Sequence, residues 1–172
     1  MLFRSTGHLN SYSLELQHRL DGLQALYEAN TTAPLPNLGF MSVAMEFIGR
    51  GGQLHYVIDA EDRVLGSAYV LGAKSLLENL NPVERLFVSL DIDAEARLAV
   101  AKSLLASIVE TAKAAVSNRP DCIWIQVFIP DGAHEHPESQ PILAALEVSG
   151  FRGAAMPRAQ LWTRLIENAN PD

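Results

Sequence analysis

Hydrophobic residues recur at helical spacing in three segments of the chain. Over Ser11–Asn30 they follow one another mainly at intervals of three and four residues, which places them on one stripe of a helix. Phe40–Ile48 repeats this spacing until a group of glycines that ends with Gly52 interrupts it. The third segment, Leu98–Val116, is the longest. The pattern predicts three amphipathic helices, the last of them entered through Asp91–Arg97.

Runs rich in β-branched and aromatic residues predict the main strands. Leu54–Ile58 and Arg63–Val70 flank the short polar turn Asp59–Asp62, which predicts an antiparallel hairpin. Arg85–Leu90 predicts a further strand directly before the long helix. Asp121–Ile129 is apolar at nearly every position, which is typical of a central strand that is covered on both faces.

Shorter elements are expected at both ends of the chain. Leu2–Thr6 is expected to form an edge strand and Ile142–Val148 a short helix. Two closing strands are expected at Gly150–Ala155 and Ala159–Ile166. The segments expected to form loops are Lys74–Pro82 and Pro130–Pro141.

The length of 172 residues suffices for one well-buried core and is too short for two ordinary domains. The chain is 48% hydrophobic and 19% charged, which is the profile of a globular protein and not of a disordered segment. We therefore expect a single domain over residues 1–166, followed by a frayed tail over residues 167–172.

Charge and targeting signals narrow the classes of function. The 13 basic and 20 acidic residues give a formal net charge of −7, which disfavours binding to nucleic acid. No apolar run approaches the roughly 20 residues of a membrane span, and the first residues lack the apolar core of a secretion signal. Cys122 is the single cysteine, so no internal disulfide can form. These features predict a cytoplasmic protein with neither a nucleic-acid nor a membrane partner.

The order of the elements and several short segments resemble a known family. Tyr56–Asp59 and Arg63–Val70 match the family's hairpin, Ala145–Phe151 the end of its last helix, and Leu161–Leu165 its closing strand. In the order of its elements and in these segments, the chain is similar to the Gcn5-related N-acetyltransferase (GNAT) superfamily. The resemblance implies an α/β fold with a mixed, mostly antiparallel sheet and helices on both faces. It also implies transfer of an acyl group from acetyl-CoA or another acyl-CoA to an amine of a small molecule or peptide.

In this family the start of the long helix holds the pyrophosphate of coenzyme A on free backbone amides, with the pattern Arg/Gln-x-x-Gly-x-Gly/Ala. Aligned on Ser103–Leu105, the chain has Ala96 at the first position and alanines at both glycine positions, so only the last position meets the pattern. The preceding acidic residues Asp91, Asp93 and Glu95 either compete with an anionic cofactor or are ordinary helix-capping residues. The resemblance implies phosphate contacts from Arg97, Leu98, Ala99, Ala101 and Lys102.

The resemblance also implies contacts to the pantetheine arm of the cofactor. The backbone of Val88, Ser89 and Leu90 would pair with the pantetheine amides if the fourth and fifth strands diverge. Gln140 takes the position of an asparagine that many members keep near this arm. Its amide is either a ligand for pantetheine or a capping or surface group before Pro141.

Three residues are candidate acceptors for the proton of the substrate amine. Glu84 falls near a glutamate that some members use as base, and its alternative role is that of a solvated residue at a strand end. His134 and His136 lie in the loop after the fifth strand and either act as base or belong to a solvated loop. No metal site is predicted there, because metal ligands need an ordered supporting shell. The tyrosine that often protonates the leaving thiolate aligns with Leu146, so this acid is missing.

Two hypotheses of function therefore stand side by side. The first is an acyl-CoA-dependent N-acyltransferase, most simply an acetyltransferase, that works by direct transfer. The second is a regulatory or interaction module that keeps the fold but has lost acyl-CoA binding, with homodimer formation through exposed sheet edges. The turn Ala96–Lys102 discriminates between them, because free amides there favour the transferase.

Overall fold

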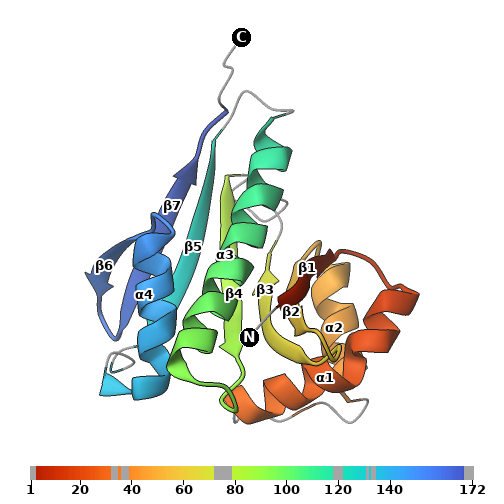
Figure 1. The fold of residues 1–172 in the computed structure, drawn as a ribbon. Helices are drawn as coiled ribbons and strands as arrows, with labels where there is room; N and C mark the ends of the chain where they lie inside the picture. Colours follow the sequence, from red (N-terminus) through yellow and green to blue (C-terminus); the bar gives the residue numbers. More distant parts are fainter. Residues whose placement is uncertain are drawn as a thin grey trace.

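A computed structural model describes residues 3–31, 35, 39–71, 79–117, 122–130, 132 and 135–168. Seven strands form one sheet in the order β1-β2-β3-β4-β5-β7-β6 (Figure 1). All neighbouring strands are antiparallel except β4 and β5, which are parallel. In chain order the elements are β1 (Phe3–Leu9), α1 (Leu14–Asn30), α2 (Phe40–Gly49), β2 (Gln53–Asp59), β3 (Val64–Val70), β4 (Leu80–Val88), α3 (Ala94–Val116), β5 (Ile123–Pro130), the 3-10 helix η2 (Pro137–Ser139), α4 (Gln140–Val148), β6 (Arg152–Met156) and β7 (Ala159–Ile166).

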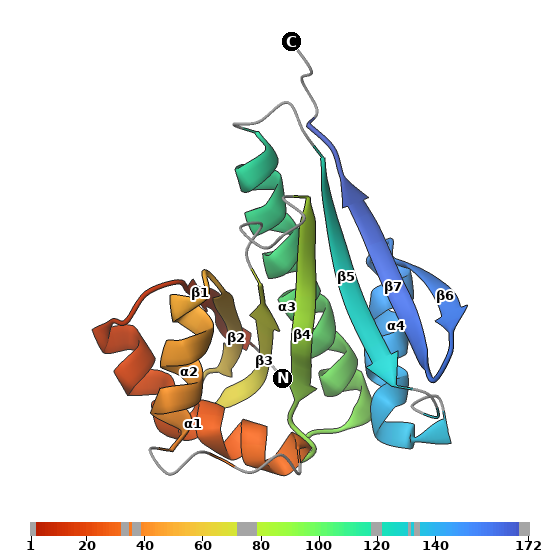
Figure 2. The same ribbon diagram turned by 180° about the vertical axis from the view of Figure 1, so that it is seen from behind.

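Helices cover both faces of the sheet. α3 and α4 lie side by side on one face, while α1 and α2 lie on the other face, over the half of the sheet that contains β1 to β4 (Figures 1 and 2). Each face has its own cluster of buried hydrophobic residues. The prediction of a mixed, mostly antiparallel sheet with helices on both faces is confirmed. Of the helices in the described ranges, none is long and apolar enough to cross a membrane.

The predicted hairpin is confirmed as β2 and β3, and both strands are buried on both faces. Because successive side chains of a strand point to opposite faces of the sheet, Val57 lies in the cluster under α3 and Tyr56 lies in the cluster under α1 and α2. Gly66 of β3 lets α3 pack closely on the sheet. A Cβ atom added at Gly66 would lie 2.5 Å from Cγ1 of Val100 on α3 and 3.2 Å from the carbonyl oxygen of Phe87 on β4.

β4 begins earlier than the sequence predicts. The expected strand starts at Arg85, after an expected loop over Lys74–Pro82, but the observed strand starts at Leu80. A proline cannot donate to a strand ladder, which is why the sequence favours a loop there. In the structure the Pro82 carbonyl accepts a hydrogen bond from the amide of Leu71 at 3.0 Å, and the pairing with β5 continues through Pro82. The first part of the expected loop, residues 74–78, lies outside the described residues.

Candidate active site

β4 carries one extra residue, Glu84, opposite β3. Its neighbours Val83 and Arg85 pair with consecutive residues of β3, so the register shifts at Glu84. The parallel ladder between β4 and β5 ends at the same place, with the pair Val83 and Val127. Because a bulge bends its strand and increases the local twist, β4 turns away from β5 from Glu84 onward. The divergence of the fourth and fifth strands that pantetheine binding requires is therefore present.

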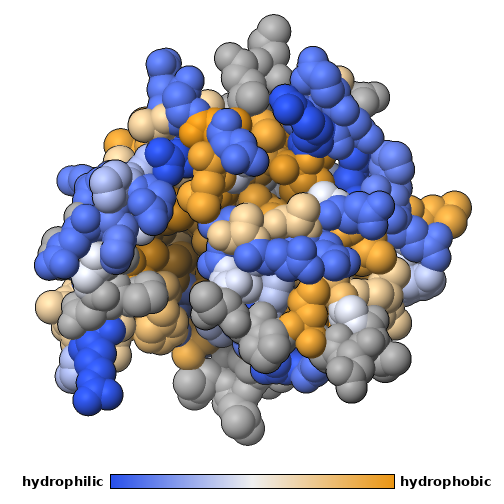
Figure 3. Space-filling view, turned by 90° about the horizontal axis from the view of Figure 1, so that it is seen from below, coloured by the Kyte–Doolittle hydropathy of each residue, from blue (hydrophilic) through white to orange (hydrophobic). Residues whose placement is uncertain are grey.

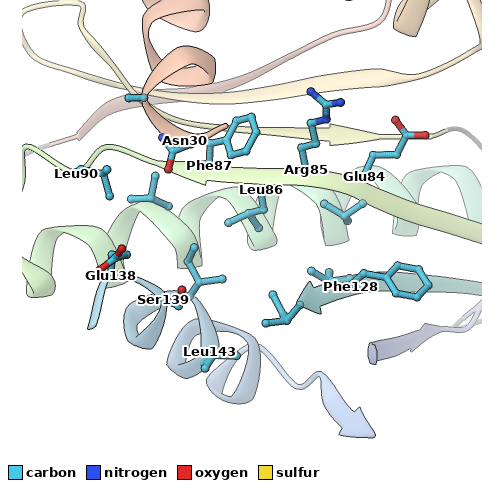
Figure 4. A pocket seen from close by; sticks show the side chains of 16 residues that line it. Asn30, Glu84, Arg85, Leu86, Phe87, Leu90, Phe128, Glu138, Ser139 and Leu143 are labelled. Atoms are coloured by element: carbon cyan, nitrogen blue, oxygen red, sulfur yellow. The ribbon is translucent and has the colours of Figure 1, made fainter. Parts of the chain in front are cut away.

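A cavity of about 400 Å³ lies between the diverging strands. Seen from this end of the sheet, the surface is hollowed between apolar side chains (Figure 3). Figure 4 shows the side chains around the cavity, which come from the end of α1, from β4 and the turn after it, and from β5, η2 and α4. Its polar lining residues are Asn30, Glu84, Arg85, Glu138 and Ser139.

The backbone of β4 lines this cleft with peptide groups that point away from β3. The amide of Ser89 donates to the carbonyl of Leu65 on β3 at 2.8 Å. Because hydrogen-bonded pairs alternate along an antiparallel ladder, Phe87 also directs its peptide groups toward β3. Leu86 and Val88 therefore direct theirs toward the cleft, beyond the last pair with β5. An extended ligand with amide groups can bind there as an added strand.

The predicted backbone contacts at Val88, Ser89 and Leu90 therefore differ in what they offer. Val88 directs its peptide groups into the cleft, whereas the Ser89 amide is already bonded to β3. Leu90 lies in the turn after β4, lines the cavity and is 49% exposed. Leu86 was not anticipated, because the alternation of the ladder is set by the partner strand and not by the sequence of β4.

Glu84 and Arg85 present opposite charges on the same side of β4 (Figure 4). The Arg50 Nη2 atom lies 3.6 Å from Glu84 Oε1, and the Glu84 side chain is 33% exposed. The guanidinium carbon of Arg85 lies 5.0 Å from the centre of the Tyr27 ring. Its Nη1 atom is buried, and no hydrogen-bond partner for it occurs within the described part of the chain.

A second cavity, of about 160 Å³, meets the first at Glu84 and Arg85. α2, Arg50 and β3 supply the rest of its lining, which consists of Val43, Glu46, Phe47, Arg50 and Tyr69. Burial raises the pKa of Tyr69 well above its ordinary value. The positive charge of Arg85 acts on the pKa of Tyr69 in the opposite direction, with a smaller effect than burial. Neither the Tyr69 hydroxyl nor that of Ser67 has a hydrogen-bond partner among the described residues. Glu84 thus lies between a long cleft and a small polar cavity.

The start of α3 is capped by the chain itself. Oδ1 of Asp93 accepts a hydrogen bond from the amide of Ala96 at 2.8 Å, and the amide of Arg97 donates to the Asp93 carbonyl at 2.9 Å. The helix therefore begins at Ala94, and only the amides of Ala94 and Glu95 follow the cap without an acceptor inside the helix. The interpretation of the acidic residues as helix caps is confirmed for Asp93.

Because α3 begins at Ala94, the backbone amides that were expected to bind phosphate do not lie at the open end of the helix. The amides of Leu98, Ala99, Ala101 and Lys102 lie inside α3, where each is positioned to donate to the carbonyl one turn earlier. They are therefore not the free donors that the resemblance implies, and the amides left open at this helix start lie one turn closer to its N-terminus. The Arg97 side chain is half-buried, and its Nε atom has no hydrogen-bond partner among the described residues. Lys102 is exposed.

Of the site residues predicted in the loop after β5, none that the structure describes lines the two cavities. His136 is exposed just before η2 and is not among the residues that line the two cavities, while His134 lies outside the described residues. Gln140 is the exposed first residue of α4. Leu146 is fully buried in the core under α3 and α4. In the ranges that the structure describes, no three His, Cys, Asp or Glu side chains form a group that could hold a metal ion.

Of the predicted residues, the structure brings Glu84, Val88 and Leu90 together around the cleft. It adds Arg85 to the cleft and Arg50 to the smaller cavity, neither of which was predicted. A signal was available for Arg85: Glu84 and Arg85 are two consecutive charged residues in a run that otherwise has the pattern of a strand. Two consecutive polar residues break the period of two, and such a break is a mark of a bulge.

No protein-family model and no curated protein matches the chain. Solved structures match it over nearly its whole length. The GNAT superfamily phosphinothricin acetyltransferase of Sinorhizobium meliloti, solved with AcCoA, has a TM-score of 0.62 at 17% identity, covering 94% of this chain and 89% of that one. The ribosomal-protein-alanine N-acetyltransferase of Brucella melitensis has a TM-score of 0.63 at 15% identity, covering 95% and 99%.

A third match is the spermidine N-acetyltransferase of Vibrio cholerae, solved with CoA and spermine. It has a TM-score of 0.58 at 11% identity, covering 95% of this chain and 96% of that one. These identities establish similarity of fold. The chain has the fold of the GNAT superfamily of acetyltransferases.

Proposed function

We propose that the protein is an acyl-CoA-dependent N-acyltransferase, most simply an acetyltransferase, that transfers the acyl group directly to an amine. The observation that carries this proposal is the separation of β4 from β5 at Glu84, which opens a cleft with backbone groups along one wall. Pantetheine has two amides on an extended chain, and such a chain pairs with the peptide groups of Leu86 and Val88 as an added strand. The shared fold supports the proposal, since it holds AcCoA in the Sinorhizobium enzyme.

In the proposed reaction the amine nitrogen attacks the thioester carbonyl carbon. The new C–N bond forms, the C–S bond breaks, and the sulfur leaves with the bonding electrons as the thiolate of coenzyme A. Glu84 accepts the proton that the amine gives up, from its position between the two cavities. The thiolate takes a proton from water, and the proton that Glu84 then releases to solvent neutralises the hydroxide that remains. Water serves here because the buried Leu146 aligns with the family's tyrosine and cannot donate a proton. Holding both substrates in contact contributes most of the rate.

A specific observation favours the second candidate, a module that no longer binds acyl-CoA. The carboxylate of Asp93 occupies the cap of α3, and the exposed carboxylates of Asp91 and Glu95 stand beside it. An anionic diphosphate at this helix start competes with all three of these charges. If the protein is a transferase, its affinity for the cofactor must therefore come more from the pantetheine arm than from the diphosphate.

Thermal unfolding with and without ligand tests the proposal. Acetyl-CoA and free CoA are expected to raise the melting temperature, because a ligand that binds only the folded state stabilises it by about 2.7 kcal/mol at 100 times its Kd. Acetyl-pantetheine, which lacks the diphosphate, should retain most of the effect. No shift with any of the three at millimolar concentration would contradict the transferase and favour the module.

A matched pair of variants locates the binding site. Leu143→Trp places a large side chain on the α4 wall of the cleft and should abolish the ligand-induced shift. Val148→Trp adds the same side chain to the same helix at a position that is 66% exposed, and should leave the shift unchanged. Equal shifts in both variants would place the ligand outside the cleft.

A further inference from the structure

Arg85 carries a positive charge that no carboxylate of the described residues neutralises. A guanidinium stays charged at all physiological pH values. Among the ion pairs of the described residues none involves Arg85, and its buried Nη1 atom has no hydrogen-bond partner there. Its neighbour Glu84 is paired with Arg50 instead. The face of Tyr27, at 5.0 Å, is a weaker partner than a carboxylate. A half-buried cation of this kind is suited to an anionic group from outside the chain.

The carboxylate of Glu84 lies on the same side of the strand as this cation (Figure 4). Among the described residues Glu84 pairs with Arg50 and not with Arg85, so the two neighbours offer a negative and a positive group that are not paired with each other. An α-amino acid carries both an ammonium and a carboxylate group and can pair with both. Glu84 lines both cavities, so an amine held by it lies next to the cleft where the thioester is proposed to bind.

The small cavity restricts which acceptors fit. Its volume of about 160 Å³ is well below the roughly 300–1,000 Å³ of sites for drug-sized ligands. Val43 and Phe47 of α2 give it an apolar wall next to the charged residues. Arg50 and Arg85 stand there beside Glu46 and Glu84, and this mixed lining suits an acceptor with both a cationic and an anionic group better than one that has only positive charges, such as a polyamine.

Resting on the proposed function, we propose that the acceptor is a small free amino acid. Arg85 binds its carboxylate, and the cavity between α2 and β3 holds its side chain. Glu84 binds its ammonium group and accepts one proton from it, which leaves the neutral amine as the nucleophile. The second proton, lost from nitrogen as the amide forms, passes through water to the thiolate of coenzyme A. Arg85 acts here as a residue that determines specificity, through a contact to a part of the acceptor that does not react.

The first test compares acceptors on the unaltered protein. Each proteinogenic L-amino acid is added singly with acetyl-CoA, and the release of CoA is measured. For each amino acid that reacts, the corresponding carboxamide is then measured in the same way. Spermidine is the cationic control. We expect at least one amino acid to react, with a KM about 10- to 100-fold lower than that of its carboxamide, because the ion pair to the carboxylate is lost. Reaction of spermidine, or equal KM values for acid and amide, would overturn the proposal.

The second test uses Arg85 itself. Arg85→Gln should raise the KM for the amino acid about 10- to 100-fold and leave the melting-temperature shift with acetyl-CoA unchanged, while the KM for the carboxamide stays the same. Arg85→Lys keeps the charge and should recover part of the loss, which separates the contact from a general effect on folding. An unchanged KM for the amino acid in Arg85→Gln would contradict the assignment.

These outcomes separate the two proposals. If acetyl-CoA raises the melting temperature but no amino acid reacts, the acceptor assignment fails while the transferase stands. If acetyl-CoA does not bind, the transferase fails. The anion site is then tested by thermal shift with the same amino acids and no acetyl-CoA. We expect a shift in melting temperature that Arg85→Gln removes. If no amino acid gives such a shift, the assignment of the anion site fails.

Discussion

Val83 and Val127 form the last pair of the parallel ladder that joins β4 to β5. The next residue on β4, Glu84, is also the residue without a partner on β3. One bulge therefore does two things. It separates the strands to open a cleft of about 400 Å³, and it places a carboxylate where that cleft meets a small polar cavity.

Glu84→Gln should lower kcat about 100- to 10,000-fold, because the amide cannot accept the proton of the amine. The shift in melting temperature with acetyl-CoA should stay unchanged, since the proposed cofactor contacts are made by the backbone. Steady-state rates together with the thermal shift provide the measurement. Glu147→Gln, on the exposed side of α4, is the control. Full activity in Glu84→Gln would remove this residue from the mechanism.

Asp93→Ser should keep most of the stability of α3, since serine is also a good N-cap, whereas Asp93→Ala should lose about 1 kcal/mol. Both variants remove a negative charge from the helix start and should bind CoA more tightly than the unaltered protein. Asp91→Ser is the control, because it removes a nearby charge and keeps the Asp93 cap.

Calorimetric titration with CoA and with acetyl-pantetheine measures the affinity of each variant for the two ligands. A gain for CoA alone, and larger in Asp93→Ser than in Asp91→Ser, would locate the diphosphate at the cap. Equal gains in affinity for CoA in Asp93→Ser and Asp91→Ser would mean that binding depends on the net negative charge near the helix start and not on the cap itself.

Gly66→Ala should destabilise the fold by about 1–3 kcal/mol through overpacking against α3. The added methyl group would lie 2.5 Å from Val100 Cγ1, closer than packed atoms can be. Gly49→Ala is the matched control, because a Cβ atom there meets nothing within 4 Å. Urea unfolding measures both. Equal stability of the two variants would show that α3 and the sheet can move apart without loss.

Stability should fall with pH between about 6.5 and about 4 because of His55. This side chain is fully buried beneath α3, where its Nδ1 atom is 2.9 Å from Ser107 Oγ and its ring stacks on His8. Burial, with a smaller effect of His8, lowers the pKa of His55 from 6.5 to about 4. The unfolded chain therefore binds the proton first, and about 3 kcal/mol of stability is lost progressively as the pH falls through this window.

His55→Gln removes the titrating group and keeps a side chain that can hydrogen-bond, so it should flatten the pH dependence of the unfolding free energy between these limits. His136→Gln, at an exposed position, should leave it as it is. The carboxylates of Asp59 and Asp62 have lowered pKa values, so their contributions are present above their ordinary value of 3.8 and are lost below it. Urea unfolding at successive pH values distinguishes the two ranges. An unaltered slope in His55→Gln would contradict the assignment.

Much of the fold could be predicted because it depends on short-range patterns. The spacing of apolar residues predicted α1, α2 and α3, and the polar turn Asp59–Asp62 predicted the hairpin of β2 and β3. Asp93 was among the residues interpreted as helix caps, and it forms the cap of α3. The early start of β4 was missed, because the consequence of Pro82 depends on whether the neighbouring strands need its missing N–H group.

The sequence by itself determined which segments become helices and strands, since helical period, turn chemistry and capping are properties of neighbours along the chain. Only the tertiary structure decided which groups are left for a ligand. The pairing of Val83 with Val127 and the bulge at Glu84 join segments that are distant in sequence. The same long-range packing places Arg85 against Tyr27, with no paired carboxylate among the described residues, and directs the peptide groups of Val88 into the cleft. Charge compensation and strand register depend on contacts between elements, and no local pattern records them.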